Sequence, residues 1–226
     1  MDSQPRKENT MRSRLLAESL GTGSIVATVL GAGFMVQNLQ VEPALGLFMI
    51  ASAVAAVLFV SISIFAPISG AHFNPLVSGA LLVLKHISSK EAGLYISAQL
   101  LGALFGALAA SLMFEKEVLI SSVSRESSGA FIGEIVASTG LVLIILQLVN
   151  LGKDNLIAPA IAAWILAGHL FTPSTSFANP AVTFGRIFSS APSGIDLQSA
   201  AWFVGAQVIG MFVALAIFTQ FRRATI

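Results

Sequence analysis

Cysteine is absent from this 226-residue chain. Its absence excludes disulfides, thiolate nucleophiles and cysteine-ligated metal sites, and it leaves the redox compartment open. Charged residues are scarce as well: they make up 10% of the chain, against about 25% in a typical soluble domain. The 12 Lys and Arg nearly balance the 11 Asp and Glu, so the net charge of +1 provides no bulk attraction for a nucleic acid.

Hydrophobic residues, in contrast, make up 55% of the chain, and the mean hydropathy is +0.86. This composition excludes a soluble enzyme, a nucleic-acid-binding protein and a disordered chain. Six apolar stretches are each roughly long enough to cross a ~30 Å hydrocarbon core as a helix, and lipid cannot satisfy an open backbone. The predicted spans are Leu15–Val36, Ala44–Ala66, Glu91–Phe114, Phe131–Val149, Asn155–Phe171 and Ser199–Phe221.

The first stretch could also be a secretory signal peptide. Glu18 lies inside it, however, and no small-residue cleavage site follows, so a span is the better interpretation. The chain is therefore predicted to be an all-α membrane protein in contact with the lipid bilayer.

Basic residues are distributed unequally between the two sides that six spans create. The positive-inside rule places the richer side, and with it both termini, in the cytoplasm of a multi-pass protein of the plasma (inner) membrane. The polar connection 115–128 would be extracellular, and we expect it to be mobile. The richer side carries Arg6, Lys7, Arg12, Arg14, Lys85, Lys90, Lys153, Arg222 and Arg223, and the other side carries Lys116, Arg125 and Arg186.

An internal repeat divides the chain into two halves. Residues 71–77 (AHFNPLV) match residues 176–182 (SFANPAV), and residues 98–102 (AQLLG) match residues 206–210 (AQVIG). Because each half has three spans, an odd number, the second half must be inverted across the membrane. The predicted organisation is a cytoplasmic tail 1–14, a first repeat 15–114, the connection 115–128 and a second repeat 129–226.

One Asn-Pro pair lies between spans in each half. A single Asn-Pro is usually only a turn signal, but Asn is a good N-cap and Pro is favoured at the first helical position. Each pair precedes an apolar stretch too short to cross the membrane, which predicts half-length helices over Leu76–Leu84 and Ala181–Phe188. Pro67, Ser69 and Gly70 are predicted to break the second span, and Thr172, Pro173 and Ser174 to end the fifth.

Inversion makes the two half-helices meet head to head near the midplane. Each N-terminus carries about half a positive charge, so two of them oppose a cation or a proton at that point. The Asn amides can donate hydrogen bonds to a neutral solute, and the carbonyls just before each Asn can accept them. A pore with this lining passes polar neutral solutes and rejects cations.

These residues resemble the aquaporin family (major intrinsic proteins), over essentially the whole chain from about Leu15 to Phe221. The resemblance depends on residues 69–75 (SGAHFNP), on residues 179–181 (NPA) and on the pairs Glu18/Glu134 and Gln99/Gln207. It implies six transmembrane helices plus two re-entrant half-helices in an inverted repeat. It also implies a homotetramer with one pore per subunit, passive conduction of water or small uncharged solutes, and no cofactor, catalytic residue or metal.

The resemblance also assigns roles to individual residues. The pore constriction would be formed by Asn74, Pro75, Leu76, Asn179, Pro180 and Ala181, and pore-lining carbonyls would come from Gly70, Ala71 and His72. Glu18, Glu134, Gln99 and Gln207 would anchor the re-entrant loops.

Two departures from the family pattern bear on selectivity. Leu76 stands where the family has Ala, and we expect a modest effect on the packing of the two half-helices. Val182 stands where the family usually has the Arg of the outer selectivity filter. Arg186 follows one helical turn later; it could swing toward the pore mouth, but we expect it in solvent or among lipid headgroups.

The other filter positions follow from their spacing to the Asn residues: Val54, Ala167 (or Gly168) and Ser176. With Val182 they predict a small, largely apolar and uncharged filter that admits solutes larger than water. Residues 176–183 (SFANPAVT) are similar to a bacterial subgroup associated with arsenic resistance, which suggests metalloid hydroxides or methylated arsenicals as solutes.

The roles of several polar residues have two interpretations. Glu18 and Glu134 are either loop anchors or a proton relay. His169 either packs in the interior or approaches the filter, and His86 is either solvated or a protonation-dependent gate. Gly102 and Gly106 form a GxxxG motif that serves either packing within a subunit or a tetramer contact.

Three function classes remain to be compared. The prediction is a passive channel with a wide outer filter that favours glycerol-like or metalloid solutes. The alternatives are a strictly water-conducting channel and a proton-coupled secondary transporter, which also uses inverted repeats. An intramembrane enzyme would need a nucleophile-base or metal set, and Glu18 and Glu134 alone do not supply one.

Overall fold

The computed structural model describes residues 9–223, which form eight α-helices and one short 3-10 helix and contain no strand. The helices are α1 (Met11–Leu39), α2 (Pro43–Ser69), α3 (Pro75–Val83), α4 (Ser89–Met113), α5 (Ser128–Asn150), α6 (Ile157–Phe171, after the 3-10 turn Asp154–Leu156), α7 (Pro180–Arg186) and α8 (Leu197–Arg223). All six predicted spans are helices long and apolar enough to cross a membrane.

The helices differ from the predicted spans by a few residues at their ends, and two of these differences have a clear local cause. Helix α1 begins at Met11, because the Thr10 side chain accepts a hydrogen bond from Ser13 N (3.2 Å), so the predicted tail 1–14 ends in helix. Pro67 does not break α2, which continues to Ser69 and ends at Gly70 (φ 86°). Pro67 has no N–H to donate to the carbonyl four residues earlier, so the last turn of α2 forms with one hydrogen bond fewer.

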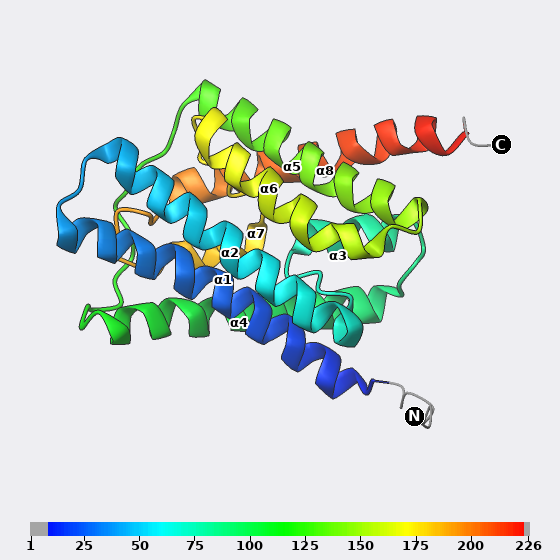
Figure 1. The fold of residues 1–226 in the computed structure, drawn as a ribbon, viewed down its shortest axis with the longest axis horizontal. Helices are drawn as coiled ribbons and strands as arrows, with labels where there is room; N and C mark the ends of the chain where they lie inside the picture. Colours follow the sequence, from blue (N-terminus) through cyan, green and yellow to red (C-terminus); the bar gives the residue numbers. More distant parts are fainter. Residues whose placement is uncertain (1–8, 224–226) are drawn as a thin grey trace.

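The two halves have matching packing. Helix α1 packs along α4, α5 packs along α8, and α2 meets α6 across the boundary between the halves. Figure 1 shows the long helices side by side along the long axis, with α1 beginning and α8 ending at the same end. The basic residues Arg6 and Lys7, counted above, lie outside the described residues.

Glycines allow α1 and α4 to approach closely. A Cβ on Gly102 would collide with the carbonyl oxygen of Ser19, and one on Gly106 with that of Gly23. The GxxxG motif therefore serves packing within one chain, the first of the two roles considered for it.

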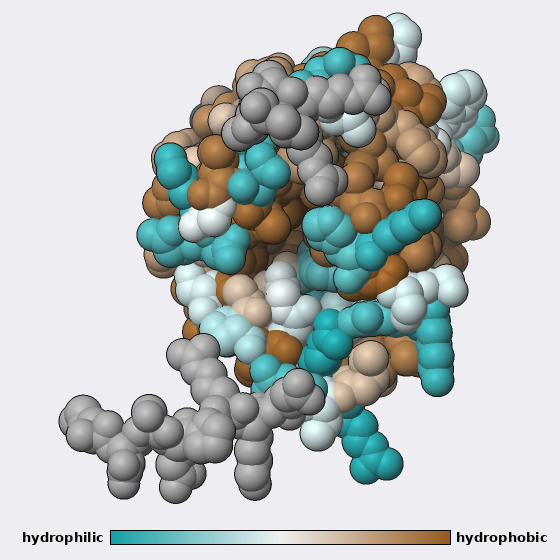
Figure 2. All heavy atoms as spheres, turned by 90° about the vertical axis from the view of Figure 1, so that its right-hand side faces the viewer, coloured by the Kyte–Doolittle hydropathy of each residue, from teal (hydrophilic) through white to brown (hydrophobic). Residues whose placement is uncertain are grey.

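Large apolar side chains cover the outside of the bundle, where a soluble protein would place polar ones. Figure 2, which views the end where α1 begins and α8 ends, shows hydrophilic groups on that face and hydrophobic ones beside them. A surface of this kind fits a bilayer environment. The most exposed large apolar side chains include those of Leu16, Phe48, Val60, Phe105, Leu112, Ile132, Trp202 and Phe212.

The connection before α5 is more tightly bound than we expected. Ser121 N donates to Ile187 O (2.7 Å), and Asp196 N donates to Val123 O (2.9 Å). The Arg125 guanidinium donates to Gly194 O (2.8 Å) and to another carbonyl of the segment after α7. These hydrogen bonds fasten residues 121–125 of the connection to the second half, whereas residues 115–120 are exposed.

Candidate functional site

The two half-helices begin at the Asn-Pro pairs. Asn74 accepts a hydrogen bond from Leu76 N (2.9 Å) through its side-chain oxygen and thereby caps α3. Asn179 accepts from Ala181 N (3.0 Å) and Val182 N (3.2 Å) and caps α7. Each Asn has extended backbone dihedrals, as an N-cap residue requires, and a Pro follows it at the helix start.

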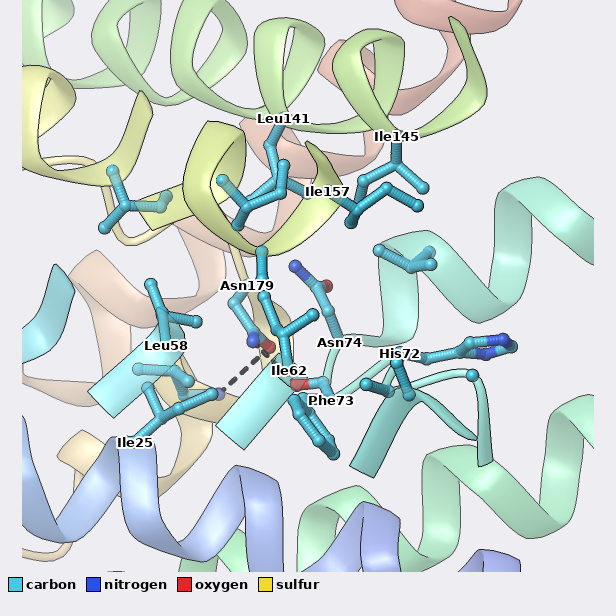
Figure 3. A pocket seen from close by; sticks show the side chains of 18 of the residues that line it. Ile25, Leu58, Ile62, His72, Phe73, Asn74, Leu141, Ile145, Ile157 and Asn179 are labelled. Carbon is cyan, nitrogen blue, oxygen red and sulfur yellow. Dashed lines mark hydrogen bonds between the residues drawn. The ribbon is translucent and has the colours of Figure 1, made fainter. Parts of the chain in front are cut away.

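Each Asn amide also crosses to the opposite half. Asn74 Nδ2 donates to Ala178 O (2.8 Å), and Asn179 Nδ2 donates to Phe73 O (2.8 Å). Figure 3 shows Asn74 and Asn179 close together, with Phe73 below them. An amide nitrogen has two hydrogens, so one N–H of each Asn remains for a solute.

A buried Glu in each half holds the adjoining loop. Glu18 accepts hydrogen bonds from His72 N (2.9 Å) and Phe73 N (2.7 Å), and also from the Ser69 hydroxyl (2.7 Å) and Gln99 Nε2 (2.8 Å).

Glu134 repeats this arrangement with Phe177 N (2.9 Å), Ala178 N (2.9 Å) and Gln207 Nε2 (2.6 Å). Each Gln is also bound to a hydroxyl of the half-helix: Gln99 to Ser78 and Gln207 to Thr183. The backbone and Gln donors occupy corresponding positions of the repeat, and in each half they bind the carboxylate oxygens of the Glu of that half. This geometry favours the anchor role for both Glu residues over a proton relay.

Both loops hold left-handed backbone conformations at matching places. The φ angle is 50° at Ala71 and 48° at Phe73, and it is 47° at Ser176 and 45° at Ala178. Such conformations cost of order 1 kcal/mol or more each for residues with a Cβ. The hydrogen bonds to Glu18 and Glu134 offset this cost. Because the strained conformations occur at matching positions of both loops, we infer that the loop backbone groups are held in a defined direction.

A continuous cavity of about 720 Å³ passes the two half-helix starts. Its lining includes His86 and Asp154 near one end of the bundle, Asn74 and Asn179 in the middle, and Arg186 toward the other end. One wall comes from the re-entrant loops and is polar. The other walls are apolar side chains of α1, α2, α5 and α6, among them Ile25, Leu58, Ile62, Leu141, Ile145 and Ile157 (Figure 3).

Comparison with known proteins identifies this arrangement. Residues 6–176 match the family model described as "Major intrinsic protein". The aquaglyceroporin AqpS of Rhizobium meliloti is 37% identical over 212 residues, which are 93% of this chain and 91% of that protein. The chain belongs to the major intrinsic protein family.

Two further relatives agree with this assignment. The aquaporin TIP1-1 of Arabidopsis thaliana is 34% identical over 75% of this chain and 72% of its own length. The structure of the aquaglyceroporin from Plasmodium falciparum has the same fold, with a TM-score of 0.70 over 94% of this chain and 95% of that one, at 22% identity. The protein is thus a multi-pass membrane channel for water and small solutes, and not an enzyme.

In this major intrinsic protein, three of the four predicted filter residues line the cavity: Val54, Ser176 and Val182. Ala167 does not; it is exposed on the outside of α6. Beyond Ile157 and Ala158 at its start, α6 lines the cavity with Ile161, Ile165 and His169, four residues apart, and Ala167 lies about 160° around the helix from His169. Gly168 is buried and packs against the Ser176 side chain.

Arg186 also differs from the expectation. It is 3% exposed, lines the cavity and donates from Nε to Ser193 O (2.6 Å). Its guanidinium carbon lies 3.3 Å from the centroid of the Phe177 ring. The expected position in solvent or among headgroups is therefore wrong, because the chain after α7 folds back and supplies a carbonyl that draws the side chain inward.

The three His residues of the channel have different surroundings. His72 lines the cavity, with Nδ1 3.0 Å from the Ser78 hydroxyl and its ring tilted by 57° against that of Tyr95. His169 is buried, and its Nδ1 lies 2.8 Å from Ile165 O, so it both packs in the interior and reaches the cavity. His86 is exposed at the opposite mouth.

Leu76, the unusual residue of the first Asn-Pro motif, is 2% exposed and joins the main hydrophobic core. It keeps its backbone bond to Asn74, so the cap is intact. The sequence predicted that the carbonyls just before each Asn, those of Phe73 and Ala178, accept hydrogen bonds from a solute, and in the structure these carbonyls accept the crossed Asn bonds.

Proposed function

We propose that this channel passes glycerol-like and metalloid solutes, such as arsenite or methylated arsenicals, as well as water. The observation that carries the proposal is the uncharged lining at Val54, Ser176 and Val182, where bulky or charged groups would narrow the opening. The relative AqpS is named an aquaglyceroporin, which agrees with a solute larger than water. Gly70, Ala71 and His72 also line the cavity, and we propose that their carbonyls accept hydrogen bonds from the solute.

A strictly water-conducting channel is the main alternative. It would need a narrow outer constriction, and the small side chain of Val182 argues against one. A proton-coupled transporter would need a relay, but Glu18 and Glu134 each accept several short hydrogen bonds from their loops and are not free to exchange protons with a solute.

Stopped-flow light scattering on proteoliposomes tests the proposal with water, glycerol, urea and arsenite. We expect flux of glycerol and arsenite that follows the solute gradient and is unaffected by a protonophore. Water flux alone would support the strictly water-conducting alternative. A flux that collapses with the protonophore would support the transporter.

We also propose a homotetramer with both termini in the cytoplasm. The orientation is supported by Lys85 and Lys153, which lie in connections, and by Lys90 in the first turn of α4, at the end where α1 begins. Because the chain has no cysteine, single cysteines introduced at Glu117 and Lys153 give two sites whose labelling from outside intact cells can be compared. We expect labelling only at position 117, and native mass spectrometry should give four subunits.

A further inference from the structure

The terminal amino groups of Arg186 have no partner among the described residues. Its hydrogen bond to Ser193 O uses Nε, and the flat face of the guanidinium lies on the Phe177 ring. Only 3% of the residue is exposed to solvent, yet its side chain lines the cavity. A guanidinium has five N–H groups, so four of them remain to meet a solute in the cavity.

Arg186 also forms no ion pair among the described residues. In the described part of the chain the one ion pair joins Arg14 to Glu91, at the far end of the bundle. Arg125, a second cation, lies over the same Phe177 ring at 5.3 Å. Glu134 is the nearest buried carboxylate, and its oxygens are occupied by the loop amides and Gln207. This mouth of the cavity is therefore electropositive.

Two further polar groups face the same mouth. The Ser176 hydroxyl is buried, has no hydrogen-bond partner within residues 9–223, and belongs to a side chain that lines the cavity. His169 directs Nδ1 to the carbonyl of Ile165, which leaves Nε2 as an acceptor. Arg186, Ser176 and His169 thus offer donors and one acceptor to a single small molecule.

The position of Arg186 along α7 separates its charge from the narrow ring. Helix α7 runs from Asn179 toward the mouth, and four residues of α-helix advance about 6 Å, so Arg186 lies that much nearer the mouth than Val182. A solute entering from this side meets the guanidinium before it meets the uncharged ring of Val54, Ser176 and Val182.

We propose that Arg186 and His169, together with the Ser176 hydroxyl of the uncharged ring, form a solute-capture site at this mouth, in which the charged position 186 is distinct from the size-selecting position Val182. The site takes small solutes that present oxygen acceptors, such as a polyol or a metalloid hydroxide, and it repels cations. The inference builds on the channel function proposed above. It assigns affinity and charge selection to position 186, and the size limit to position 182.

Substitution of Arg186 tests this division. In Arg186→Gln we expect the half-saturating glycerol concentration to rise about tenfold, because bonds to a charged donor are lost. Potassium leak should rise, while the permeability ratio of glycerol to sorbitol should stay unchanged. Arg125→Gln is the matched control: Arg125 lies over the same Phe177 ring but does not line the cavity. The half-saturating glycerol concentration and the permeability ratio should therefore remain as in the wild type, and potassium leak should rise less than in Arg186→Gln. Arg186→Lys keeps the charge and should keep cation exclusion.

A competition measurement on the unaltered protein covers the case in which Arg186→Gln does not fold. Formate should compete for the donors of Arg186 and raise the half-saturating glycerol concentration at least about twofold, because it offers a charged acceptor. Tetramethylammonium should have no effect, with sodium gluconate holding the ionic strength constant.

The outcomes separate the two proposals. No solute flux in wild-type vesicles overturns both the channel function and this inference. Normal flux without formate competition, or with equal effects of Arg186→Gln and Arg125→Gln, overturns the inference alone. A changed glycerol-to-sorbitol ratio in folded Arg186→Gln also overturns it, because the size limit would then depend on position 186.

Discussion

Replacing Asn179 by Asp places a negative charge where the two half-helices meet. The new carboxylate can still cap α7 through Ala181 N and Val182 N, so the helix start should survive. It cannot donate to Phe73 O, which loses a 2.8 Å bond. The main consequence is electrostatic, because the two helix N-termini together carry about one positive charge at this point.

The size of the effect follows from Coulomb's law. One unit of charge about 4 Å from a passing cation raises its energy by about 4 kcal/mol at an effective dielectric constant of 20. The Asp charge offsets this term, and every 1.4 kcal/mol is a factor of ten. We therefore expect potassium permeability to rise at least about tenfold, with roughly a thousandfold as the upper bound.

The assay is potassium flux into proteoliposomes, with glycerol flux as the measure of an open, folded pore. Asn155→Asp is the matched control, because Asn155 lines the cavity at its exposed end, away from both half-helices. It adds the same charge and should leave the potassium permeability near the wild-type value. Unchanged potassium flux in an Asn179→Asp protein that still passes glycerol would refute the dipole argument, and so would equal increases in both variants.

Three further predictions concern the filter, the anchor and the helix packing. Val182→Arg should lower glycerol flux roughly tenfold while sparing water, because a long side chain fills the uncharged ring; equal losses of both fluxes would contradict it. Glu134→Ala should cost about 3 kcal/mol or more, seen as a lower melting temperature in detergent, because three donors lose their acceptor. Its control is Ser138→Ala, whose buried hydroxyl has no partner. Gly102→Ala should destabilise the protein by about 1–3 kcal/mol through its collision with α1, whereas Gly93→Ala, which meets open space, should not.

Local sequence chemistry was sufficient for the half-helices and their anchors. An Asn followed by Pro favours a helix start, and its occurrence once in each half before a short apolar stretch was enough to predict that α3 and α7 begin at those places. The equal positions of Glu18 and Glu134 in the repeat indicated a common role, because an inverted repeat gives both the same surroundings.

The positions of Ala167 and Arg186 relative to the cavity could not be predicted from the sequence. Counting residues back from Asn179 assumes a fixed path between α6 and α7, and the rotation of α6 instead turns His169 and Ile165 toward the cavity. The place of Arg186 depends on Ser193 O and the Phe177 ring, which are tertiary partners that no local pattern of the sequence specifies.

The crossed Asn bonds also say something about the order in which the protein is built. Each Glu anchor contacts only residues of its own half, so each loop can dock as soon as its three spans are made. The bonds from Asn74 to Ala178 O and from Asn179 to Phe73 O need both halves. Closure of the pore centre is therefore expected to be a late step of biogenesis, completed only after the second half has left the ribosome and met the waiting first half.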